Sequence, residues 1–130
     1  MYWPTAMTTE AKTFGTQNES LAAEYLRLQG YEIVVRNYRT PIGEIDIVAY
    51  HKGTLVFVEV KSRRSSRFGP AKYAVTPQKQ QKLSKTAMWY LKSTRQFHVK
   101  ARFDVVAIDN HPNAPRIELI QNAFDLTPTR

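Results

Sequence analysis

Residues 43–63 read GEIDIVAYHKGTLVFVEVKSR, and this stretch decides the predicted fold. Two runs at 44–50 and 54–63 are rich in β-branched and aromatic residues, which indicates two strands. His51-Lys52-Gly53-Thr54 between them is typical of a hairpin connection. The centre of the second run, Leu55 to Val58, is apolar on both faces, so we expect an interior strand covered on both sides.

The length of the hairpin turn sets the pairing of the two strands. A two-residue turn at Lys52 and Gly53 places His51 opposite Thr54 and Asp46 opposite Glu59. Opposed residues have Cβ atoms about 5 Å apart, and a slip of one residue would turn the apolar faces over. Strict alternation then predicts one face with Glu44, Asp46, Val48 and Tyr50 and another with Ile45, Ile47 and Ala49.

Two opposed carboxylates, Asp46 and Glu59, destabilise a sheet unless another group compensates their repulsion. A divalent cation does so, since Mg²⁺ is often held by one or two carboxylates together with substrate phosphate. In the structural alternative, Lys61, two residues along on the same face as Glu59, pairs with that carboxylate while Asp46 faces solvent near a strand end.

The charge distribution favours the metal interpretation. The chain carries a net charge of +8, with 19 basic and 11 acidic residues. Residues 61–103 hold twelve of the basic residues and no acidic one, which leaves seven basic and eleven acidic residues elsewhere. A domain polarised in this way is suited to a polyanion, so we expect nucleic acid as the partner, the alternative being a solvated basic surface.

Composition sets the broad class of the protein. A chain of 130 residues with 42% hydrophobic residues suits one globular domain, predicted at 14–130 after a flexible leader at 1–13. The absence of cysteine excludes disulfides, thiolate metal sites and a cysteine nucleophile. No apolar run approaches the length of a membrane span, and no apolar signal segment opens the chain, so a soluble cytoplasmic protein is expected.

The remaining elements complete an α/β pattern. We expect a helix at 16–29, with Thr16 and Glu19 as a capping box and Gly30 as its stop, and a second helix at 76–93 that starts with Thr76 and Pro77. The apolar side of the first helix is predicted to hold Leu21, Ala22, Tyr25, Leu28 and Gln29, and that of the second Leu83, Ala87, Tyr90 and Leu91. Further strands are expected at 31–39 and 101–109, with a shorter one at 116–120. Loops or turns are expected at 41–43, 64–75 and 110–113, and the order α-β-β-β-α-β-β predicts a mixed sheet.

Several other side chains receive a structural interpretation. His51, His98 and His111 show no ligand spacing and are expected in turns or on the surface. Trp89, Tyr90 and Phe97 are expected in the core, with base stacking as the alternative. Arg102 and Asp104 share a strand face and are expected to form an ion pair.

The ordered motifs resemble a known family. Gly43 to Val48 followed by Phe57 to Lys61 resembles the Asp…Glu-x-Lys core of the PD-(D/E)xK nuclease superfamily. The closer resemblance is to the YraN-like endonuclease family, distant relatives of archaeal Holliday junction resolvases, and it spans about residues 14–126. The further matching segments are 15–23, 36–39, 68–71 and 102–106, and one departure is Asn18, where the family usually has Gly.

The resemblance implies a fold, a site and a cofactor. It implies a restriction-endonuclease-like αβββαβ core, a mixed central sheet flanked by helices. It carries over Glu19, Asp46 and Glu59 as ligands of Mg²⁺ or Mn²⁺, and Lys61 as the lysine beside the attacked phosphate. Glu19 thus has two competing roles, metal ligand and capping-box residue. The residues expected to contact nucleic acid are Arg63, Arg64, Arg67, Gln78, Lys79, Lys82 and Lys85.

Three functions remain open from the sequence. The first is a metal-dependent endonuclease acting on DNA, branched DNA included, in which a bound cation lowers the pKa of its water and binds a phosphate oxygen. The second is a nucleic-acid-binding module without turnover on the same fold. The third is a domain whose basic face docks an acidic protein. The intact set of Asp46, Glu59 and Lys61 favours the first, and the analogy with junction resolvases allows a homodimer.

Overall fold

The computed structural model describes residues 17–63, 75–110 and 115–126. After a helix at residues 17–28, the elements are β1 (Glu32–Thr40), β2 (Gly43–His51), β3 (Thr54–Arg63), α2 (Pro77–Ser93), β4 (Ala101–Asn110) and β5 (Pro115–Phe124). The strands form one sheet in the order β1-β2-β3-β4-β5, with β3 and β4 parallel and every other pair antiparallel. The predicted α/β class with a mixed sheet is confirmed.

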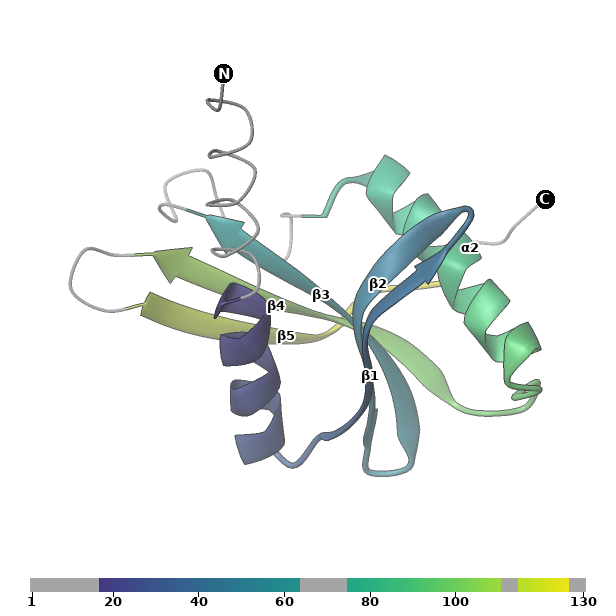
Figure 1. Ribbon diagram of the computed structural model, residues 1–130, viewed down its shortest axis with the longest axis horizontal. Helices are drawn as coiled ribbons and strands as arrows, with labels where there is room; N and C mark the ends of the chain where they lie inside the picture. Colours follow the sequence, from purple (N-terminus) through teal and green to yellow (C-terminus); the bar gives the residue numbers. More distant parts are fainter. Residues whose placement is uncertain (1–16, 64–74, 111–114, 127–130) are drawn as a thin grey trace, which may run out of the picture.

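The two helices cover opposite faces of the sheet (Figure 1). Under the helix at residues 17–28, Ala22, Ala23 and Leu26 pack against Val56 and Val106. On the other face, α2 residues pack against the sheet, among them Leu83, Ala87 and Tyr90, with Phe57 and Phe103 beneath them. Successive residues of β3 contribute to alternate clusters, which explains why its centre is apolar throughout.

The first helix corrects the predicted apolar side. It ends before Gly30, which has φ +91°, as expected for a C-terminal stop. However, Leu28 is exposed, while Ala23 and Leu26, absent from the predicted stripe, are fully buried. Apolar residues cover more than half of the circumference of this short helix, so periodicity alone selected the wrong stripe. The two small alanines allow the helix to lie close to the sheet. The predicted leader and Thr16 lie outside the described residues.

The second helix agrees with the prediction at both ends. The Thr76 hydroxyl accepts a hydrogen bond from the Lys79 N–H at 3.2 Å, and Pro77 occupies the first turn. The helix ends at Ser93, and Leu83, Ala87 and Tyr90 are buried. Trp89 is 42% exposed and Phe97 65% exposed, so the prediction that they belong to the core is wrong. Trp89 lies on the exposed side of α2, and Phe97 lies beyond the end of the helix.

The β2–β3 hairpin has the predicted register. Lys52 and Gly53 form a two-residue turn with positive φ at both positions, 51° and 79°, and His51 pairs with Thr54. The last strand is longer than predicted, because β5 extends to Phe124, whose ring stacks on Phe103 at 4.7 Å between centroids. The predicted loops at 64–74 and 111–113 lie outside the described residues. No helix in the described ranges is long and apolar enough to cross a membrane.

Candidate active site

The site lies where β2 and β3 separate. Their antiparallel pairing runs from His51 and Thr54 to Ile47 and Val58. Beyond this point the β1–β2 hairpin bends away, whereas β3 continues beside β4 to Arg63 (Figure 1).

A carboxylate fills the start of the gap between the two strands. The Val60 N–H donates a hydrogen bond of 2.8 Å to Oδ2 of Asp46. The Asp46 side chain therefore satisfies a backbone donor of β3 beyond the end of the ladder and is held in a fixed position.

This geometry corrects the predicted alternation along β2. Ile45 packs in the α2-side cluster with Val48, whereas Ile47 packs on the opposite side, so Ile45 and Ile47 do not share a face. The irregularity coincides with Asn37 of β1, which the register places beside Asp46 and which has φ +54°. Asparagine tolerates this left-handed conformation better than most residues. The irregular backbone explains why Asp46 reaches Val60 rather than following a strict strand face.

Asp46 and Glu59 form a carboxyl pair. Burial, followed by the charge of Glu59 and a hydrogen bond between the two side chains, raises the pKa of Asp46 to about 7. The Val60 N–H and the Lys79 ammonium act in the opposite direction but do not cancel these effects. A hydrogen bond between two carboxyl groups requires a proton on one of them, so the pair shares a proton below neutral pH.

Lys79 is the basic group that the fold brings to this pair. Its Nζ lies 3.7 Å from Oε2 of Glu59, whose side chain is only 11% exposed. Lys79 sits in the first turn of α2, where the helix dipole adds positive potential. Gln78, the neighbouring candidate, is exposed.

Glu19 lies close enough for Asp46 to influence its ionisation. Burial raises the pKa of Glu19 and the charge of Asp46 raises it further, while Asn37 and Arg36 act to lower it. With its NH₂ group turned toward the carboxylate, Asn37 donates to both Glu19 oxygens at 2.9 and 3.1 Å. Sequence reasoning did not assign Asn37 to the site, although residues 36–39 belong to a matching motif. A signal that could have found it is the position of Asn37 opposite Asp46.

The departure at Asn18 also has a structural consequence. The Asn18 amide donates to the Ser62 hydroxyl at 3.2 Å, and the Asn110 amide donates to the same oxygen at 2.6 Å. These bonds tie the first helix to the ends of β3 and β4 next to Glu19. A glycine at position 18 could not form the first of them.

The donor set suits a cation held by two carboxylates. Asp46 and Glu59 carry closely spaced oxygens whose repulsion is relieved by a shared proton, and a divalent cation could replace that proton. Within residues 17–63, 75–110 and 115–126, no group of three or more acidic or histidine side chains is arranged to hold a metal. Water and phosphate oxygens would therefore complete the coordination, as is common for Mg²⁺. The assignment of Glu19 as a third ligand stays a prediction.

The other predicted site residues differ in their exposure and in their partners. Lys61 is exposed on β3, two residues past Glu59. Arg63 is 17% exposed, and its Nε lies 2.5 Å from a carboxylate oxygen of Asp109. Arg64 and Arg67 lie outside the described residues. Lys82 and Lys85 are exposed on α2.

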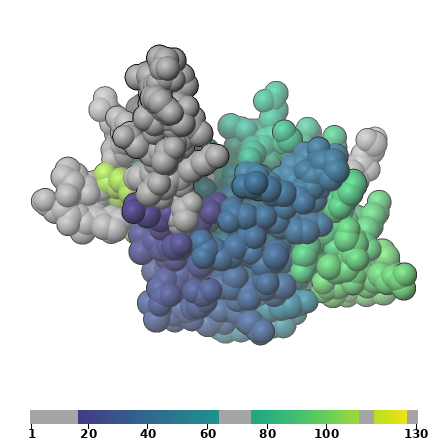
Figure 2. Space-filling view, viewed as in Figure 1, coloured from purple at the N-terminus to yellow at the C-terminus, as the bar shows by residue number. Residues whose placement is uncertain are grey.

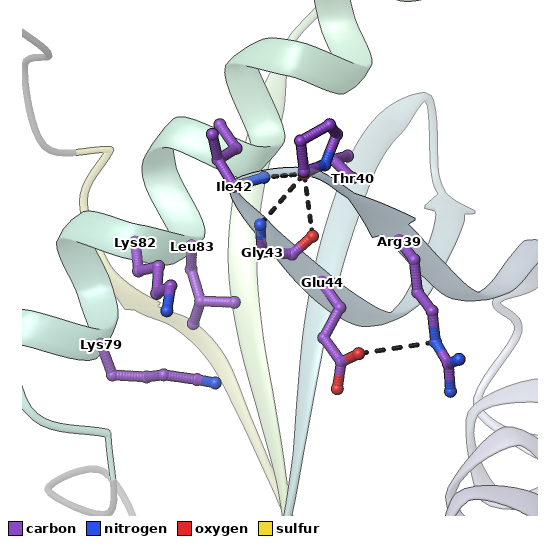
Figure 3. Close-up of a pocket in the computed structure, with 9 residues that line it drawn as sticks. Arg39, Thr40, Ile42, Gly43, Glu44, Lys79, Lys82 and Leu83 are labelled. Atoms are coloured by element: carbon purple, nitrogen blue, oxygen red, sulfur yellow. Dashed lines mark hydrogen bonds and ion pairs between the residues drawn. The ribbon is translucent and has the colours of Figure 1, made fainter.

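A basic pocket lies beside Lys79. Its volume is about 440 Å³, and it lies between α2 and the turn of the β1–β2 hairpin. Lys79 and Lys82 extend from α2 into this space, and Arg39 lies across it, 3.5 Å from Glu44 (Figure 3). The hairpin turn and the helix are adjacent on one face of the molecule (Figure 2). With three basic groups and one acid, the pocket suits an anion such as a phosphate.

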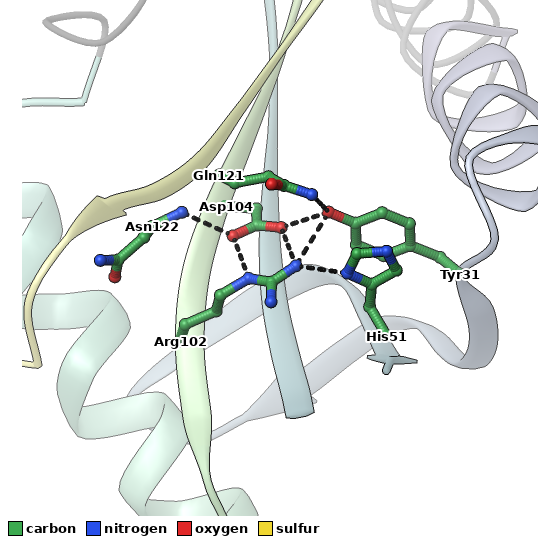
Figure 4. A network of polar contacts seen from close by, with 6 residues as sticks. All are labelled: Tyr31, His51, Arg102, Asp104, Gln121 and Asn122. Carbon is green, nitrogen blue, oxygen red and sulfur yellow. Dashed lines mark hydrogen bonds and ion pairs between the residues drawn. The ribbon is translucent and has the colours of Figure 1, made fainter. Parts of the chain in front are cut away.

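A second polar network lies on the face of the sheet covered by the first helix (Figure 4). Asp104, fully buried, accepts hydrogen bonds from the Tyr31 hydroxyl at 2.7 Å and from Arg102 Nε at 2.9 Å. The Gln121 amide donates to the Tyr31 oxygen at 3.0 Å, and the Asn122 N–H donates to Asp104 at 2.9 Å. The predicted Arg102–Asp104 ion pair is confirmed, and it joins β4 to β5 and to the start of β1.

His51 belongs to this network, so the prediction that it is a surface residue is wrong. It is 8% exposed, its ring stacks on Tyr31 at 4.2 Å, and its Nδ1 lies 2.8 Å from the Arg102 guanidinium. Since arginine only donates, Nδ1 accepts this bond and carries no proton. Burial and then the charge of Arg102 lower the pKa of His51, which keeps the imidazole neutral. His98 is exposed as predicted, and His111 lies outside the described residues.

Comparison with known proteins gives consistent matches. Residues 18–108 match the description "Uncharacterised protein family UPF0102". A UPF0102 protein of Desulfosudis oleivorans is 49% identical over 119 residues, which cover 92% of this chain and 95% of that protein. One of Geobacter sulfurreducens is 51% identical over 116 residues, covering 88% and 91%, and one of Geobacter metallireducens is 48% identical over 120 residues, covering 92% and 98%.

Proposed function

This chain belongs to the UPF0102 family, and from the arrangement of its acidic and basic groups we propose that it is a metal-dependent endonuclease that hydrolyses phosphodiester bonds in DNA. The proposal places it in the PD-(D/E)xK superfamily. One observation carries it: Asp46 and Glu59 form a carboxyl pair in the gap between β2 and β3, beside the basic α2 surface. Binding alone does not need two adjacent, partly buried carboxylates.

In this proposal Asp46 and Glu59 hold one Mg²⁺ or Mn²⁺, which when bound supplies an acidified water and a clamp for a phosphate oxygen. The Val60 N–H fixes the Asp46 carboxylate, so that its oxygens need little reorganisation. Glu19, held by Asn37, adds negative charge close to the pair. Lys61, exposed two residues past Glu59, stabilises negative charge that develops on the attacked phosphate.

The basic groups around the pocket would position a nucleic-acid strand. Lys79 and Lys82 on α2, with Arg39 on the hairpin, present positive charge within one pocket. Contacts to phosphate carry no sequence information, but they fix the register of a strand on the protein. We infer that a nucleic-acid strand runs along α2 into the gap between β2 and β3. Lys79 then connects the basic pocket with the carboxyl pair.

One observation favours the second candidate, a nucleic-acid-binding module without turnover. Lys79 lies in ion-pair range of Glu59 and partly neutralises the site without a cation. Such an ion pair would offset part of the negative charge that a metal ion would otherwise neutralise. The protein would then bind phosphates without cleaving the nucleic acid.

A cleavage screen separates the two functions. Single-stranded, duplex, flap and four-way DNA are incubated with the protein and with Mg²⁺ or Mn²⁺, and products are resolved on denaturing gels. Cleavage that disappears in Asp46→Asn and persists in Glu118→Gln, an exposed acid on β5, supports the nuclease. Binding without cleavage under every metal, equal in wild type and Asp46→Asn, supports the binding module and overturns the nuclease.

A further inference from the structure

The exposed side of α2 carries an aromatic residue among lysines. Trp89 is 42% exposed, and it lines an open pocket of about 210 Å³ with Ile42, Lys85, Met88 and Lys92. Lys85 and Lys92 flank Trp89 at four and three residues along the helix, so the three side chains lie on adjoining turns. Nothing in the core requires this indole, because Leu83, Ala87 and Tyr90 already fill the buried stripe.

The hairpin turn fixes one wall of this pocket. The Ile42 and Gly43 N–H groups both donate to the Thr40 hydroxyl, at 3.2 and 3.1 Å, which holds the turn in one conformation. A Cβ on Gly43 would lie 2.7 Å from the Thr86 hydroxyl, so the turn packs directly on α2. Ile42 is therefore held against the helix beside Trp89, and it lines both this pocket and the basic pocket next to Lys79.

We propose that Trp89, with Ile42 beside it and Lys85 and Lys92 around it, is a stacking site for an unpaired base of a nucleic-acid strand. An exposed aromatic ring binds the face of any base, and flanking lysines bind the adjacent phosphates. A base within a duplex is already stacked on both faces and cannot offer one to Trp89. The occupant is therefore a single-stranded segment. This inference rests on the proposed function and narrows its substrate class.

The spacing between Trp89 and Lys79 along α2 suits one continuous nucleic-acid strand. Trp89 lies ten residues after Lys79 on α2, about 15 Å along the helix at its usual rise. That length corresponds to about four base steps of stacked DNA. A substrate with unpaired nucleotides next to the cleaved bond would thus place phosphates at Lys79 and Lys82 while one base stacks on Trp89.

Tryptophan fluorescence tests this site in the full-length chain. The chain has two tryptophans, so Trp3→Phe leaves Trp89 as the single reporter. We expect that dT15 and U15 quench its emission, since both present unpaired bases, and that a blunt 15-base-pair duplex quenches it much less. Equal quenching by the duplex, or none by dT15 under conditions where dT15 binds, overturns the stacking site.

Affinity measurements give a second readout. Trp89→Ala should weaken dT15 binding at least about fivefold, since stacking on one base is worth roughly 1–3 kcal/mol. Trp89→Phe should retain most of that affinity, and Phe97→Ala, which removes a more exposed aromatic ring outside the pocket, should change nothing. Thermal melting of each variant shows whether the fold is kept. Lys92→Ala changes an exposed side chain and leaves the indole ring in place, and it should also weaken dT15 binding.

The outcomes separate this inference from the proposed function. Metal-dependent cleavage with unchanged dT15 affinity in Trp89→Ala overturns the stacking site and leaves the nuclease. Stacking on Trp89 without cleavage supports the site and overturns the nuclease. If no nucleic acid binds at low salt, both the stacking site and the nuclease are overturned.

Discussion

The backbone N–H of Val60 donates a 2.8 Å hydrogen bond to the carboxylate of Asp46 at the point where β2 and β3 stop pairing. The bond connects the fold to the site, because it holds an acidic side chain in a gap that a regular sheet would close. Burial, and then the nearby carboxylate of Glu59, make Asp46 costly to ionise. The raised pKa of Asp46 therefore makes two measurable properties depend on this carboxyl group: the pH dependence of stability and the binding of divalent cations proposed above.

Stability should depend on pH through Asp46. The pKa of this carboxyl is raised from 3.8 to about 7 on folding, so the folded state binds the proton more tightly than the unfolded state. The resulting stabilisation is complete below about pH 4 and is lost as the pH rises through 7. Thermal melting of the metal-free protein at pH 5, 6, 7 and 8 should show a fall of a few degrees.

Asp46→Asn removes this titration while keeping the side-chain shape. We expect its melting temperature at pH 8 to exceed that of the wild type, because the repulsion with Glu59 is gone. Its pH dependence between 5 and 8 should also be flatter. Glu118→Gln serves as the control for removing one exposed acid. Parallel pH profiles for wild type and Asp46→Asn would contradict the carboxyl pair.

Divalent cations should bind the wild type and stabilise it. A ligand that binds only the folded state raises the melting temperature, and calorimetry with Mn²⁺ should give a matching heat of binding. Both signals should disappear in Asp46→Asn and in Glu59→Gln. Glu19→Gln should weaken binding less, because Asn37 already engages that carboxylate. Equal losses in all three variants would instead make Glu19 a full ligand.

Lys61→Ala should separate metal binding from turnover. The side chain is exposed and Glu59 already has Lys79 as a partner, so we expect unchanged Mn²⁺ binding and an unchanged melting temperature. The activation free energy of single-turnover cleavage should rise by about 2–4 kcal/mol, the usual effect of losing one donor that stabilises charge in the transition state. Lys100→Ala, another exposed lysine, is the control. A cleavage rate within twofold of wild type would remove Lys61 from the proposed machinery.

Local signals predicted most of the fold. Thr76, Pro77 and the Lys52-Gly53 turn act through their immediate neighbours, and the elements they delimit agree with the prediction. The side of the first helix and the length of β5 depend instead on tertiary packing. Leu26 is buried and Leu28 is exposed because the sheet packs against only one side of the helix. The periodicity of the sequence cannot predict which side that is, because apolar residues cover more than half of the helix.

The candidate site was predictable only in part for the same reason. The predicted hairpin register is confirmed from His51 and Thr54 to Ile47 and Val58, and Asp46 lies just beyond this ladder, where burial and then the carboxyl group of Glu59 raise its pKa. Irregular backbone geometry decided the rest: the positive φ of Asn37 and the separation of the strands at Asp46 have no periodic signature. The predicted burial of Trp89 was wrong because enough apolar side chains on α2 cover the sheet without it.

DNA affinity should fall steeply with salt. If roughly four to six phosphates are neutralised, the slope of log affinity against log salt is about −0.9 for each contact. The double variant Lys82→Ala/Lys85→Ala should flatten this slope by about two contacts, since both lysines are exposed beside the two pockets on α2. Lys52→Ala/Lys100→Ala, two exposed lysines elsewhere, is the matched control. An unchanged slope in the α2 variant would place the binding surface elsewhere.

The buried network around Asp104 should dominate stability. Asp104→Ala leaves the Arg102 guanidinium and the Tyr31 hydroxyl without their main acceptor, so we expect a loss of about 3–5 kcal/mol. Tyr31→Phe should cost about 1–3 kcal/mol, because Asp104 and Arg102 each lose one hydrogen bond but stay paired with each other. The double variant should cost less than the sum, since both changes break the same 2.7 Å bond. Urea unfolding measures all three, with Arg27→Ala at the exposed Glu24 pair as a control expected within about 1 kcal/mol of wild type. Strict additivity would mean that the network acts as separate contacts rather than as one cooperative unit.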